Sequence, residues 1–326
     1  MGLKVALVER EQQLGGVCLN WGCIPTKALL KQAEVFQLVN RAEEFGIEVG
    51  KVSANWEKII ARSRRVANGL ANGVAYLMKK NKVQVFAGKG RITPSKKVEV
   101  WSEKEELVEV LEAADIIIAT GSKPKSIPGV EIDGSTVLSS KESMVLEAKP
   151  KSLLIVGAGA IGIEFAYFYN TFGTEVTVLE ALPQVLPRED AEVAELLARS
   201  LENQGIRIEV GAKVESIQVI KGGAEVVFVG SGGDEKKRVE KVLMAVGVAG
   251  YTEGLGLEAL GVKMERGDVL VNGRMQTSVR GIYAIGDVVG APQLAHMAAA
   301  EGIAAAELIA GKERPEIDRS FIPSCV

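Results

Sequence analysis

The feature that most constrains the fold of this chain is a continuous apolar stretch followed at once by a glycine-rich turn. Residues 153–156 read Leu-Leu-Ile-Val, which is typical of a strand buried on both faces of a parallel sheet. Residues 157–162 read Gly-Ala-Gly-Ala-Ile-Gly, and residues 160–172 favour a helix that Gly173 ends. Residues 175–180 then predict a second strand that ends in a carboxylate. This order of elements predicts a dinucleotide-binding α/β fold.

The turn and the acid indicate which dinucleotide binds. The glycines permit a tight turn, and a pyrophosphate can then approach the amides of a helix N-terminus. Glu180 would accept hydrogen bonds from ribose hydroxyls and repel a 2′-phosphate, which favours NAD over NADP. The alternative for Glu180 is a solvated glutamate at the end of a strand, and no phosphate-binding arginine is evident near it. The turn residues expected to contact NAD are Gly157, Gly159, Ala160, Ile161 and Gly162.

A second copy of this pattern is incomplete at the start of the chain. Residues 2–9, Gly-Leu-Lys-Val-Ala-Leu-Val-Glu, repeat the pattern of residues 173–180, so Glu9 is a second candidate ribose acid. An alignment of the two copies would place the counterpart of Gly157 before the first residue. We therefore expect a second dinucleotide fold that lacks its first strand and glycine loop. An edge strand with a terminal glutamate is the alternative.

Two of the three cysteines, Cys18 and Cys23, lie close together in the sequence. A disulfide gains little stability from closing so short a loop. Regular helix would separate their Cα atoms by about 7.5 Å, whereas bridged Cα atoms usually lie about 4.4–6.8 Å apart, so the backbone between them should depart from helix. Zinc would need more ligands, and only His296 and Cys325 remain, both remote in sequence. We expect a redox role and no metal site.

Composition limits the other possibilities. The chain has 326 residues, of which 47% are hydrophobic and 25% charged, as is ordinary for a soluble protein of about two domains. The net charge is −3 with basic and acidic residues interspersed, which argues against a nucleic-acid partner. No run reaches the length of a membrane span, and the N-terminus has no signal-peptide pattern. Few cysteines fit a reducing compartment, so we expect a cytoplasmic location.

Residues 15–30 carry a family resemblance. Their sequence, Gly-Gly-Val-Cys-Leu-Asn-Trp-Gly-Cys-Ile-Pro-Thr-Lys-Ala-Leu-Leu, resembles the redox-disulfide segment of the flavin-dependent pyridine nucleotide disulfide oxidoreductases, most closely that of the dihydrolipoamide dehydrogenases. Residues 115–122, expected to form a strand, and residues 282–287 are similar to further segments of the family. The resemblance follows the family's order along the whole chain. It implies two Rossmann-like dinucleotide-binding domains, one for FAD and one for NAD.

The resemblance also implies how these domains divide the sequence. The FAD domain would comprise residues 1–148, without its first strand, and would be completed by residues 271–326, so that it is discontinuous. Residues 149–270 would form the NAD domain, and residues 25–80 a helical hairpin-like excursion. Family members continue with an interface domain that forms a dimer and supplies a His-Glu base, and we expect that domain to be absent. His296 is not expected to be this base.

The resemblance assigns roles in the redox segment. Cys23 would face the flavin, and Cys18 would exchange with a dithiol substrate. Pro25 favours a helix that begins just after Cys23, where the helix N-terminus and Lys27 both favour a thiolate. A cation in the first turn is disfavoured by the helix dipole, so Lys27 needs a partner, and Glu164 is the one the family implies. In the family the matching pair lies beside the flavin and the nicotinamide. Two unrelated surface charges are the alternative.

Further cofactor contacts follow from the resemblance. The positions that match FAD-binding residues are Glu9, Gly15, Gly16, Lys27, Gly88, Gly90, Thr120, Gly121, Ser122, Asp287 and Ala295. Val214 and Gly247 match positions that face NAD. As a bare pattern, the Gly-Asp pair that includes Asp287 would also fit an ordinary turn.

The implied activity is oxidation of a protein-bound dihydrolipoyl group, with electrons passing through the disulfide and FAD to NAD. The implied partners are the lipoyl domain of a 2-oxoacid dehydrogenase or glycine cleavage complex and, in the full-length parent, a second copy of the chain. The alternatives are another disulfide or mercuric reductase of the family and a nucleotide-binding redox module without turnover. Because a central strand is expected to be missing, we also expect the chain alone to bind FAD poorly and to aggregate.

Overall fold

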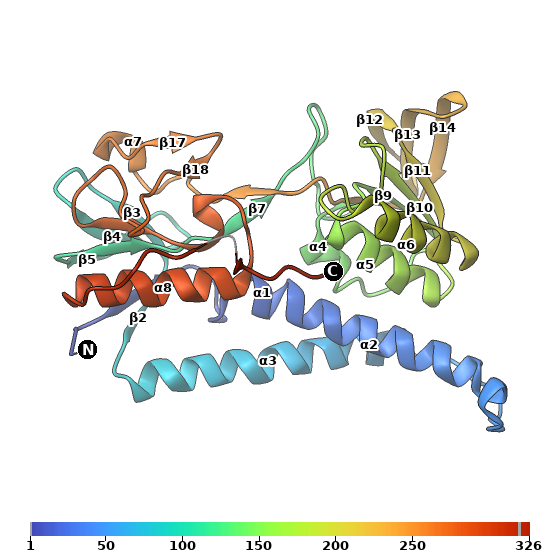
Figure 1. Ribbon diagram of the computed structural model, residues 1–326, viewed down its shortest axis with the longest axis horizontal. Helices are drawn as coiled ribbons and strands as arrows, with labels where there is room; N and C mark the ends of the chain where they lie inside the picture. Colours follow the sequence, from blue (N-terminus) through green and yellow to red (C-terminus); the bar gives the residue numbers. More distant parts are fainter. Residues whose placement is uncertain (1, 319–320) are drawn as a thin grey trace. The chain divides into compact units, whose positions relative to one another are not determined.

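The structure is a computed structural model that describes residues 2–318 and 321–326 as two compact units (Figure 1). Unit 1 comprises Met1–Asn20, Gly69–Lys123 and Val248–Val326. Unit 2 comprises Trp21–Asn68 and Pro124–Gly247. Each unit is thus assembled from separate stretches of sequence. The predicted domain limits concern which cofactor each stretch binds, so they stay a prediction.

Unit 2 contains a five-stranded sheet in the order β11-β10-β9-β15-β8, in which every neighbouring pair is parallel. The strands are β8 (Val137–Leu138), β9 (Ser152–Val156), β10 (Glu175–Glu180), β11 (Arg207–Val210) and β15 (Lys241–Met244). The two strands predicted around the glycine turn are confirmed as β9 and β10. β9 is central, which agrees with the continuous apolar run that predicted it.

Both faces of this sheet are covered, and the side chains of β9 alternate between them. Leu153 and Ile155 pack into a core with Phe165 of α5 (Ala160–Thr171), the helix predicted after the turn. Leu154 and Val156 pack into a second core with Phe228 and its neighbours in an antiparallel sheet. That sheet consists of β12 (Lys213–Ile220), β13 (Gly223–Gly230) and β14 (Gly233–Val239), and lies across the parallel sheet from α5 in Figure 1.

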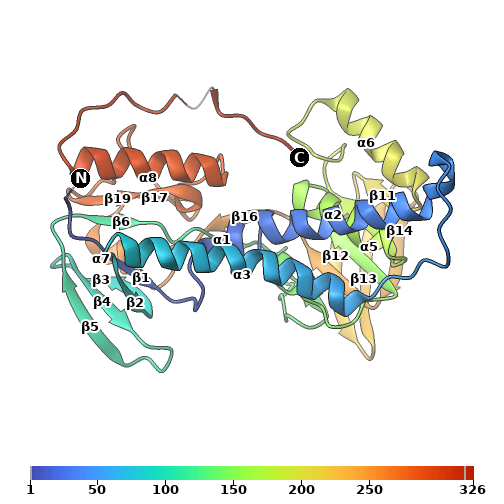
Figure 2. The same ribbon diagram turned by 90° about the horizontal axis from the view of Figure 1, so that it is seen from below.

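Two long helices form the predicted excursion. They are α2 (Cys23–Asn40) and α3 (Trp56–Lys80), joined through η1 (Ala42–Phe45), and Figure 2 shows both. The boundary between the units falls inside α3. Within unit 2, Trp56 packs its ring against Phe168 and Tyr169 of α5, with ring centroids 5.4 and 5.6 Å apart. The remaining helices of this unit are α4 (Ser140–Ser143) and α6 (Ala191–Asn203).

The sheets that the structure describes in unit 1 are all small. Parallel pairs are formed by β1 (Ala6–Glu9) with β2 (Gln84–Ala87) and by β6 (Ile116–Ile118) with β19 (Ile282–Ala284). An antiparallel sheet consists of β3 (Lys89–Ile92), β4 (Lys97–Trp101) and β5 (Leu107–Glu112). Two further pairs are β7 (Ser122–Pro124) with β16 (Val248–Gly250) and β17 (Met264–Glu265) with β18 (Asp268–Val269). Among the described strands, none joins the β1–β2 pair to the β6–β19 pair.

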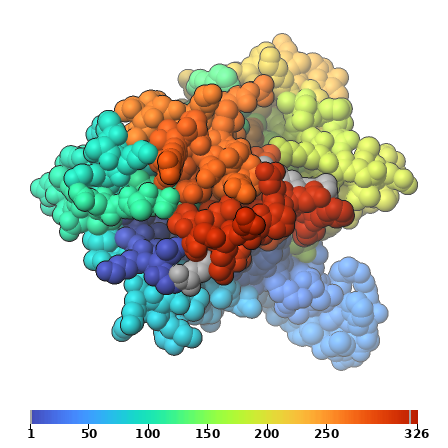
Figure 3. All heavy atoms as spheres, turned by 60° about the vertical axis from the view of Figure 1, so that its left-hand side comes forward, coloured from blue at the N-terminus to red at the C-terminus, as the bar shows by residue number. Residues whose placement is uncertain are grey.

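The core of unit 1 gathers around β6 and β19. Ile118 and Ile282 pack there with Leu257 of α7 (Leu257–Leu260) and Val288 of η2 (Gly286–Val289). The last helix, α8 (Ala295–Ile309), packs through Ala305 against β19. The described start of the chain lies beside α8 in Figures 1, 2 and 3, and α1 (Gly16–Asn20) follows it in sequence. Unit 1 is therefore discontinuous in sequence and brings distant segments together.

The described residues lack both a helix that could span a membrane and a cluster of side chains that could bind a metal ion. None of the helices within residues 2–318 and 321–326 is long and apolar enough to cross a membrane. Over the same residues, no group of three or more His, Cys, Asp or Glu side chains is arranged to hold a metal ion.

Candidate functional site

The glycine turn of unit 2 connects β9 to α5 and contains two glycines that packing requires. Gly157 has a φ of +105°, and a Cβ there would lie 2.4 Å from the carbonyl oxygen of Ala245. A Cβ on Gly162 would lie 2.0 Å from the carbonyl oxygen of Gly157. Larger residues at either position would overlap backbone. These two glycines let the turn fold tightly between the strand and the helix.

Gly159 differs from these two glycines because its backbone conformation is ordinary and its surroundings are open. It is the N-cap of α5, with a φ of −71°, and the helix has no side-chain cap at this end. No heavy atom of another element lies within 4 Å of a Cβ built on it. Ala160 and Ile161 begin the helix. The open space in front of this helix N-terminus suits the close approach of a pyrophosphate, so the turn fits NAD.

Glu180 lies at the carboxyl end of β10 and is only 8% exposed. Its Oε2 accepts a hydrogen bond from the backbone N–H of Ala158 in the turn at 2.7 Å, and its Oε1 accepts one from the N–H of Leu182 at 2.9 Å. The carboxylate is therefore fixed against the glycine turn, a contact that the sequence did not predict. Its assignment to a ribose remains a prediction.

The two other residues predicted to face NAD also belong to unit 2. Gly247 follows β15, whose last residue pairs with the last residue of β9, so that Gly247 comes after the same edge of the sheet as the turn. Its φ is +102°, and the space where a Cβ would stand is open to 4 Å. Val214 lies in β12 and is half-buried beside the second core.

The redox segment consists of two helices with a break between them. Cys18 is half-buried in α1, which ends at Asn20, and Cys23 is exposed as the first residue of α2. The predicted departure from helix between the cysteines is thus confirmed. α2 begins two residues earlier than Pro25 predicts. A proline is compatible with any position in the first turn of a helix, because the backbone N–H groups there have no partner in the helix. The structure has no disulfide among the described residues, which include all three cysteines.

Asn20 has a role that the sequence did not predict. Its side chain is buried, and Nδ2 donates to the carbonyl oxygens of Gln13, Leu14 and Gly16 at 3.3, 3.2 and 3.1 Å. These contacts connect α1, which carries Cys18, to the preceding loop. They lie entirely within unit 1.

Lys27 and Glu164 are brought together as expected. Lys27 Nζ donates to Glu164 Oε1 at 2.5 Å, although the residues lie 137 positions apart, one on α2 and the other on α5. The lysine side chain is 59% exposed and the glutamate side chain 13%. The pair gives the first turn of α2 a cation whose charge is balanced by a largely buried carboxylate.

The predicted flavin residues of unit 1 form two groups, the first around the end of β6. Ser122 Oγ donates to Asp287 Oδ2 at 2.6 Å, and Thr120 Oγ1 donates to the carbonyl oxygen of Tyr251 at 2.6 Å. Gly121 between them has a φ of +71° with open space at its Cβ position. This glycine interrupts the single strand predicted for residues 115–122, which is divided into β6 and β7. Ala295, the first residue of α8, is exposed.

The second group lies where β1 ends. Glu9 is the last residue of this strand, and its Oε1 accepts from the N–H of Glu11 at 3.0 Å. The loop glycines Gly15 and Gly16 have φ values of +118° and +69°, and the space beside Gly16 is open. Gly90 lies in β3 next to β1. A pocket of about 210 Å³ is lined by Arg10, Glu11, Gly88, Lys89 and Glu103.

These residues fit an adenine dinucleotide at the end of β1. A carboxylate that ends a parallel strand, a loop glycine with open space beside it and a nearby pocket are what such a ligand requires. The hydroxyl of Ser122 and the carboxylate of Asp287 add polar groups at the end of β6, where a flavin chain with hydroxyl groups would find hydrogen-bond partners.

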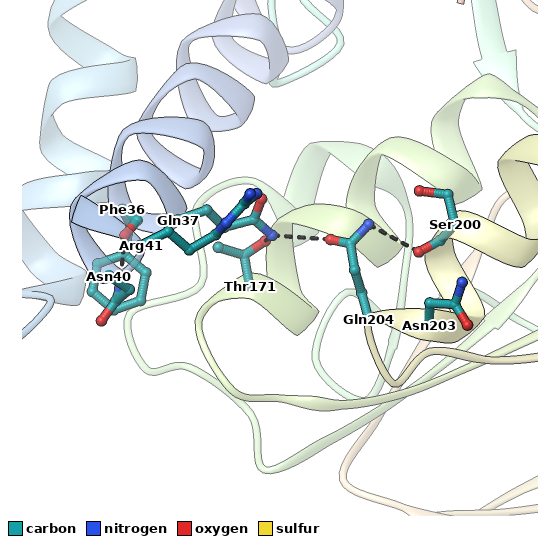
Figure 4. Close-up of a pocket in the computed structure, with 8 residues that line it drawn as sticks. All are labelled: Phe36, Gln37, Asn40, Arg41, Thr171, Ser200, Asn203 and Gln204. Carbon is teal, nitrogen blue, oxygen red and sulfur yellow. Dashed lines mark hydrogen bonds between the residues drawn. The ribbon is translucent and has the colours of Figure 1, made fainter. Parts of the chain in front are cut away.

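A larger pocket in unit 2 is lined by none of these residues. It has a volume of about 600 Å³ and lies where α2, α5 and α6 end (Figure 4). Its polar side chains already bond one another, since Gln37 Nε2 donates to Thr171 Oγ1 and to Gln204 Oε1. We do not assign a catalytic role to this pocket, because no predicted cofactor or redox residue lines it.

His296 and Cys325 have no part in these groups. His296 is exposed on α8, where its Nε2 lies 3.0 Å from the carbonyl oxygen of Pro323. Cys325 is exposed in residues 321–326, which contain no strand.

The fold and the site define a class of protein that binds two dinucleotides and carries a cysteine pair at a helix start. A family model described as pyridine nucleotide-disulphide oxidoreductase matches residues 1–302. The chain belongs to this family, whose members use FAD and NAD and act on sulfur groups.

Individual relatives agree with this assignment. A curated dihydrolipoyl dehydrogenase of Chlorobaculum tepidum is 48% identical over 327 residues, covering 100% of this chain and 69% of the relative. One of Zymomonas mobilis is 45% identical and is covered to 70%. The crystal structure of LpdA from Mycobacterium tuberculosis is similar with a TM-score of 0.87 at 28% identity, covering 97% of this chain and 68% of that one. The HOCl-induced flavoprotein disulfide reductase RclA from Escherichia coli is similar with a TM-score of 0.82 at 28% identity.

Proposed function

We propose that this chain provides the FAD- and NAD-binding parts of a dihydrolipoyl dehydrogenase, which oxidises a protein-bound dihydrolipoyl group and reduces NAD+ to NADH. The observation that carries the proposal is the 48% identity to a relative of that name over the whole chain. The geometry of unit 2 supports the proposal. Cys23 is the first residue of α2, and Lys27, four residues further along this helix, is paired with Glu164.

Cys18 and Cys23 are the proposed redox pair. The two thiols of the dihydrolipoyl group become a disulfide while the Cys18–Cys23 disulfide becomes two thiols, so two electrons and two protons pass to the protein. Cys18 exchanges with the substrate, and Cys23 is the inner sulfur. The N-terminus of α2 stabilises negative charge at Cys23 and so favours its thiolate. FAD, when bound, supplies the two-electron chemistry that connects these thiols to NAD+.

The remaining predicted residues hold the cofactors in this proposal. In unit 2, the turn from Gly157 to Gly162 binds the NAD pyrophosphate through its amides, and Glu180 accepts from the ribose. In unit 1, Glu9 accepts from the adenosine ribose of FAD, and Asp287 from the ribityl chain. The proposed division is residues 1–148 and 271–326 for FAD and residues 149–270 for NAD. The support is that the five-stranded parallel sheet draws most of its strands from this last stretch.

We extend the proposal to partners and location. The dihydrolipoyl group is carried by a lipoyl domain of a 2-oxoacid dehydrogenase or glycine cleavage complex, the enzyme works as a homodimer, and it works in the cytoplasm. The support is the name shared by the curated relatives, because dihydrolipoyl groups occur on such domains.

The test follows the thiols directly and needs no complete turnover. The reduced chain is mixed anaerobically with oxidised lipoamide, and each cysteine is then alkylated and identified by mass spectrometry. We expect Cys18 and Cys23 to lose their thiols together as dihydrolipoamide forms, with Cys325 unchanged. A second arm adds FAD, NAD+ and dihydrolipoamide and follows NADH absorbance.

The controls are Cys18→Ser and Cys325→Ser. The first should prevent the exchange, and the second should leave it intact. Exchange with oxidised glutathione but none with lipoamide would contradict the proposed substrate. A Cys18–Cys23 pair that reacts with neither would exclude the redox function.

A further inference from the structure

Glu301 is a buried charged side chain that the proposed mechanism does not use. It lies on α8 and is 2% exposed, and its Oε2 accepts a hydrogen bond from the backbone N–H of Gly286 at 2.7 Å. Burial of a carboxylate costs free energy unless strong hydrogen bonds compensate for lost hydration. The hydrogen bonds that Glu301 accepts should therefore explain why a glutamate is buried at this position.

One group that Glu301 holds is the turn that carries Asp287. Gly286 begins η2, which only Ile285 separates from β19, and has a φ of +72°. A Cβ on it would lie 3.2 Å from the Cβ of Ala298 on α8, so the turn and the helix are closely packed. The next residue is Asp287, whose Oδ2 accepts from Ser122 Oγ at 2.6 Å.

The turn is thus fixed on two sides within unit 1. Glu301 fixes the peptide N–H that precedes Asp287, and Ser122 fixes one oxygen of the Asp287 carboxylate. With the peptide and one oxygen both held, the direction of the second oxygen, Oδ1, is set by the protein before any ligand binds. Such preorganisation reduces the ordering cost of binding.

We propose that Glu301 is a positioning residue of the flavin site, which acts through Gly286 to orient the carboxylate of Asp287 toward the hydroxyl groups of the cofactor. This inference rests on the proposed function, which assigns Asp287 to FAD. Glu301 itself does not touch the cofactor.

The test compares two substitutions of similar volume. Glu301→Gln keeps an oxygen that can accept from Gly286, whereas Glu301→Met fills the space without such an acceptor. Glu307→Ala is a control on the same helix, where Glu307 is paired with Arg314. Amide hydrogen exchange at Gly286 and the dissociation constant for FAD, measured by flavin fluorescence, are the two readouts.

We expect Glu301→Met to speed exchange at Gly286 and to weaken FAD binding, each by about tenfold or more, as for loss of a hydrogen bond to a charged group. Glu301→Gln and Glu307→Ala should stay within about threefold of the unchanged protein in both readouts. Binding of NADH, which the proposal assigns to unit 2, should not change. If Glu301 served only to fill space, Glu301→Gln would not bind FAD more tightly than Glu301→Met.

Each other outcome has a defined meaning. Unchanged FAD affinity in Glu301→Met, with FAD bound by the unchanged protein, overturns the inference and leaves the proposed function standing. Absence of any FAD binding by the unchanged protein overturns both. If Glu301→Met does not fold, Glu301→Asp takes its place, because its side chain is one methylene shorter and moves the acceptor away from Gly286. Fast exchange of the Gly286 amide in the unchanged protein would also overturn the inference.

Discussion

At the level of single residues, the three glycines of residues 157–162 have different surroundings. Gly157 and Gly162 are enclosed by backbone atoms, whereas Gly159 faces open space. The first two are therefore needed for the fold, whereas the proposed role of the third is to leave room for a ligand. A sequence motif alone cannot separate these roles, because it records only the residue type.

Substitution of these glycines should separate stability from binding. Helix propensity would favour Gly162→Ala by about 0.5–1 kcal/mol, but the new Cβ would lie 2.0 Å from the Gly157 oxygen. We expect the overlap to dominate and to lower the free energy of unfolding by about 1–3 kcal/mol. Gly159→Ala should change that free energy by less than about 0.5 kcal/mol but weaken NADH binding by about tenfold. Urea unfolding and NADH fluorescence titration measure the two effects, and an equal loss of stability in both variants would contradict this reasoning.

Asn20 should be sensitive to replacement for a different reason. Asn20→Ala removes a buried side-chain amide that donates to the carbonyl oxygens of Gln13, Leu14 and Gly16, and the loss of these hydrogen bonds should cost about 1–3 kcal/mol. The matched control is Asn81→Ala, because Asn81 donates to one carbonyl on an exposed helix end and should cost less than about 0.5 kcal/mol. Urea unfolding of both variants checks this, and equal midpoints would show that the Asn20 contacts contribute nothing.

At the level of elements, α2 determines the environment of Cys23. The thiol lies at the first position of an 18-residue helix whose first turn contains no acidic residue. Helix N-termini stabilise anions, and the thiolate is the reactive form of cysteine. Cys325 is also exposed but lies outside any helix.

We therefore expect Cys23 of the reduced chain to react with iodoacetamide faster than Cys325 at neutral pH, by about tenfold. Mass spectrometry of timed samples follows both sites in one polypeptide, so that Cys325 is an internal control. Rates that are equal, or a faster Cys325, would show that the helix start does not activate the thiol.

At the level of the whole molecule, the two units differ in how their parallel strands are protected. The five-stranded sheet of unit 2 has helices on one face and β12–β14 on the other. In unit 1, β1 pairs with β2 alone among the described strands. Val5, which directly precedes β1, is 51% exposed, and Val85 of β2 is 42% exposed. Parallel strands are normally buried on both faces, and a two-stranded sheet is marginal by itself.

Unit 1 should therefore open more readily than unit 2. We expect the amides of β1 to exchange at least about tenfold faster than those of β9, and FAD binding by the chain to be weak for the same reason. Hydrogen exchange with mass spectrometry and an FAD titration provide the measurements. Equal protection of β1 and β9, together with tight stoichiometric FAD, would show that the small sheets of unit 1 are as stable as the large one.

Much of unit 2 could be predicted from the sequence, because local spacing carried the information. The apolar run, the glycines and the strand-end acid gave β9, α5 and β10 with nearly the observed limits. The strand expected over residues 115–122 was less accurate, since Gly121 adopts a left-handed conformation that divides it. Pro25 likewise placed the start of α2 two residues late.

The sequence by itself determined the dinucleotide fold of unit 2 and the break between Cys18 and Cys23, because short-range patterns of apolar residues and glycines set secondary structure. Only the tertiary structure decided which side chains meet. The bonds from Glu180 to Ala158 and from Glu301 to Gly286 join residues on different elements. Such contacts depend on how helices pack on strands, and local patterns do not encode that packing. The Lys27–Glu164 pair was anticipated only through resemblance, since 137 positions separate its members.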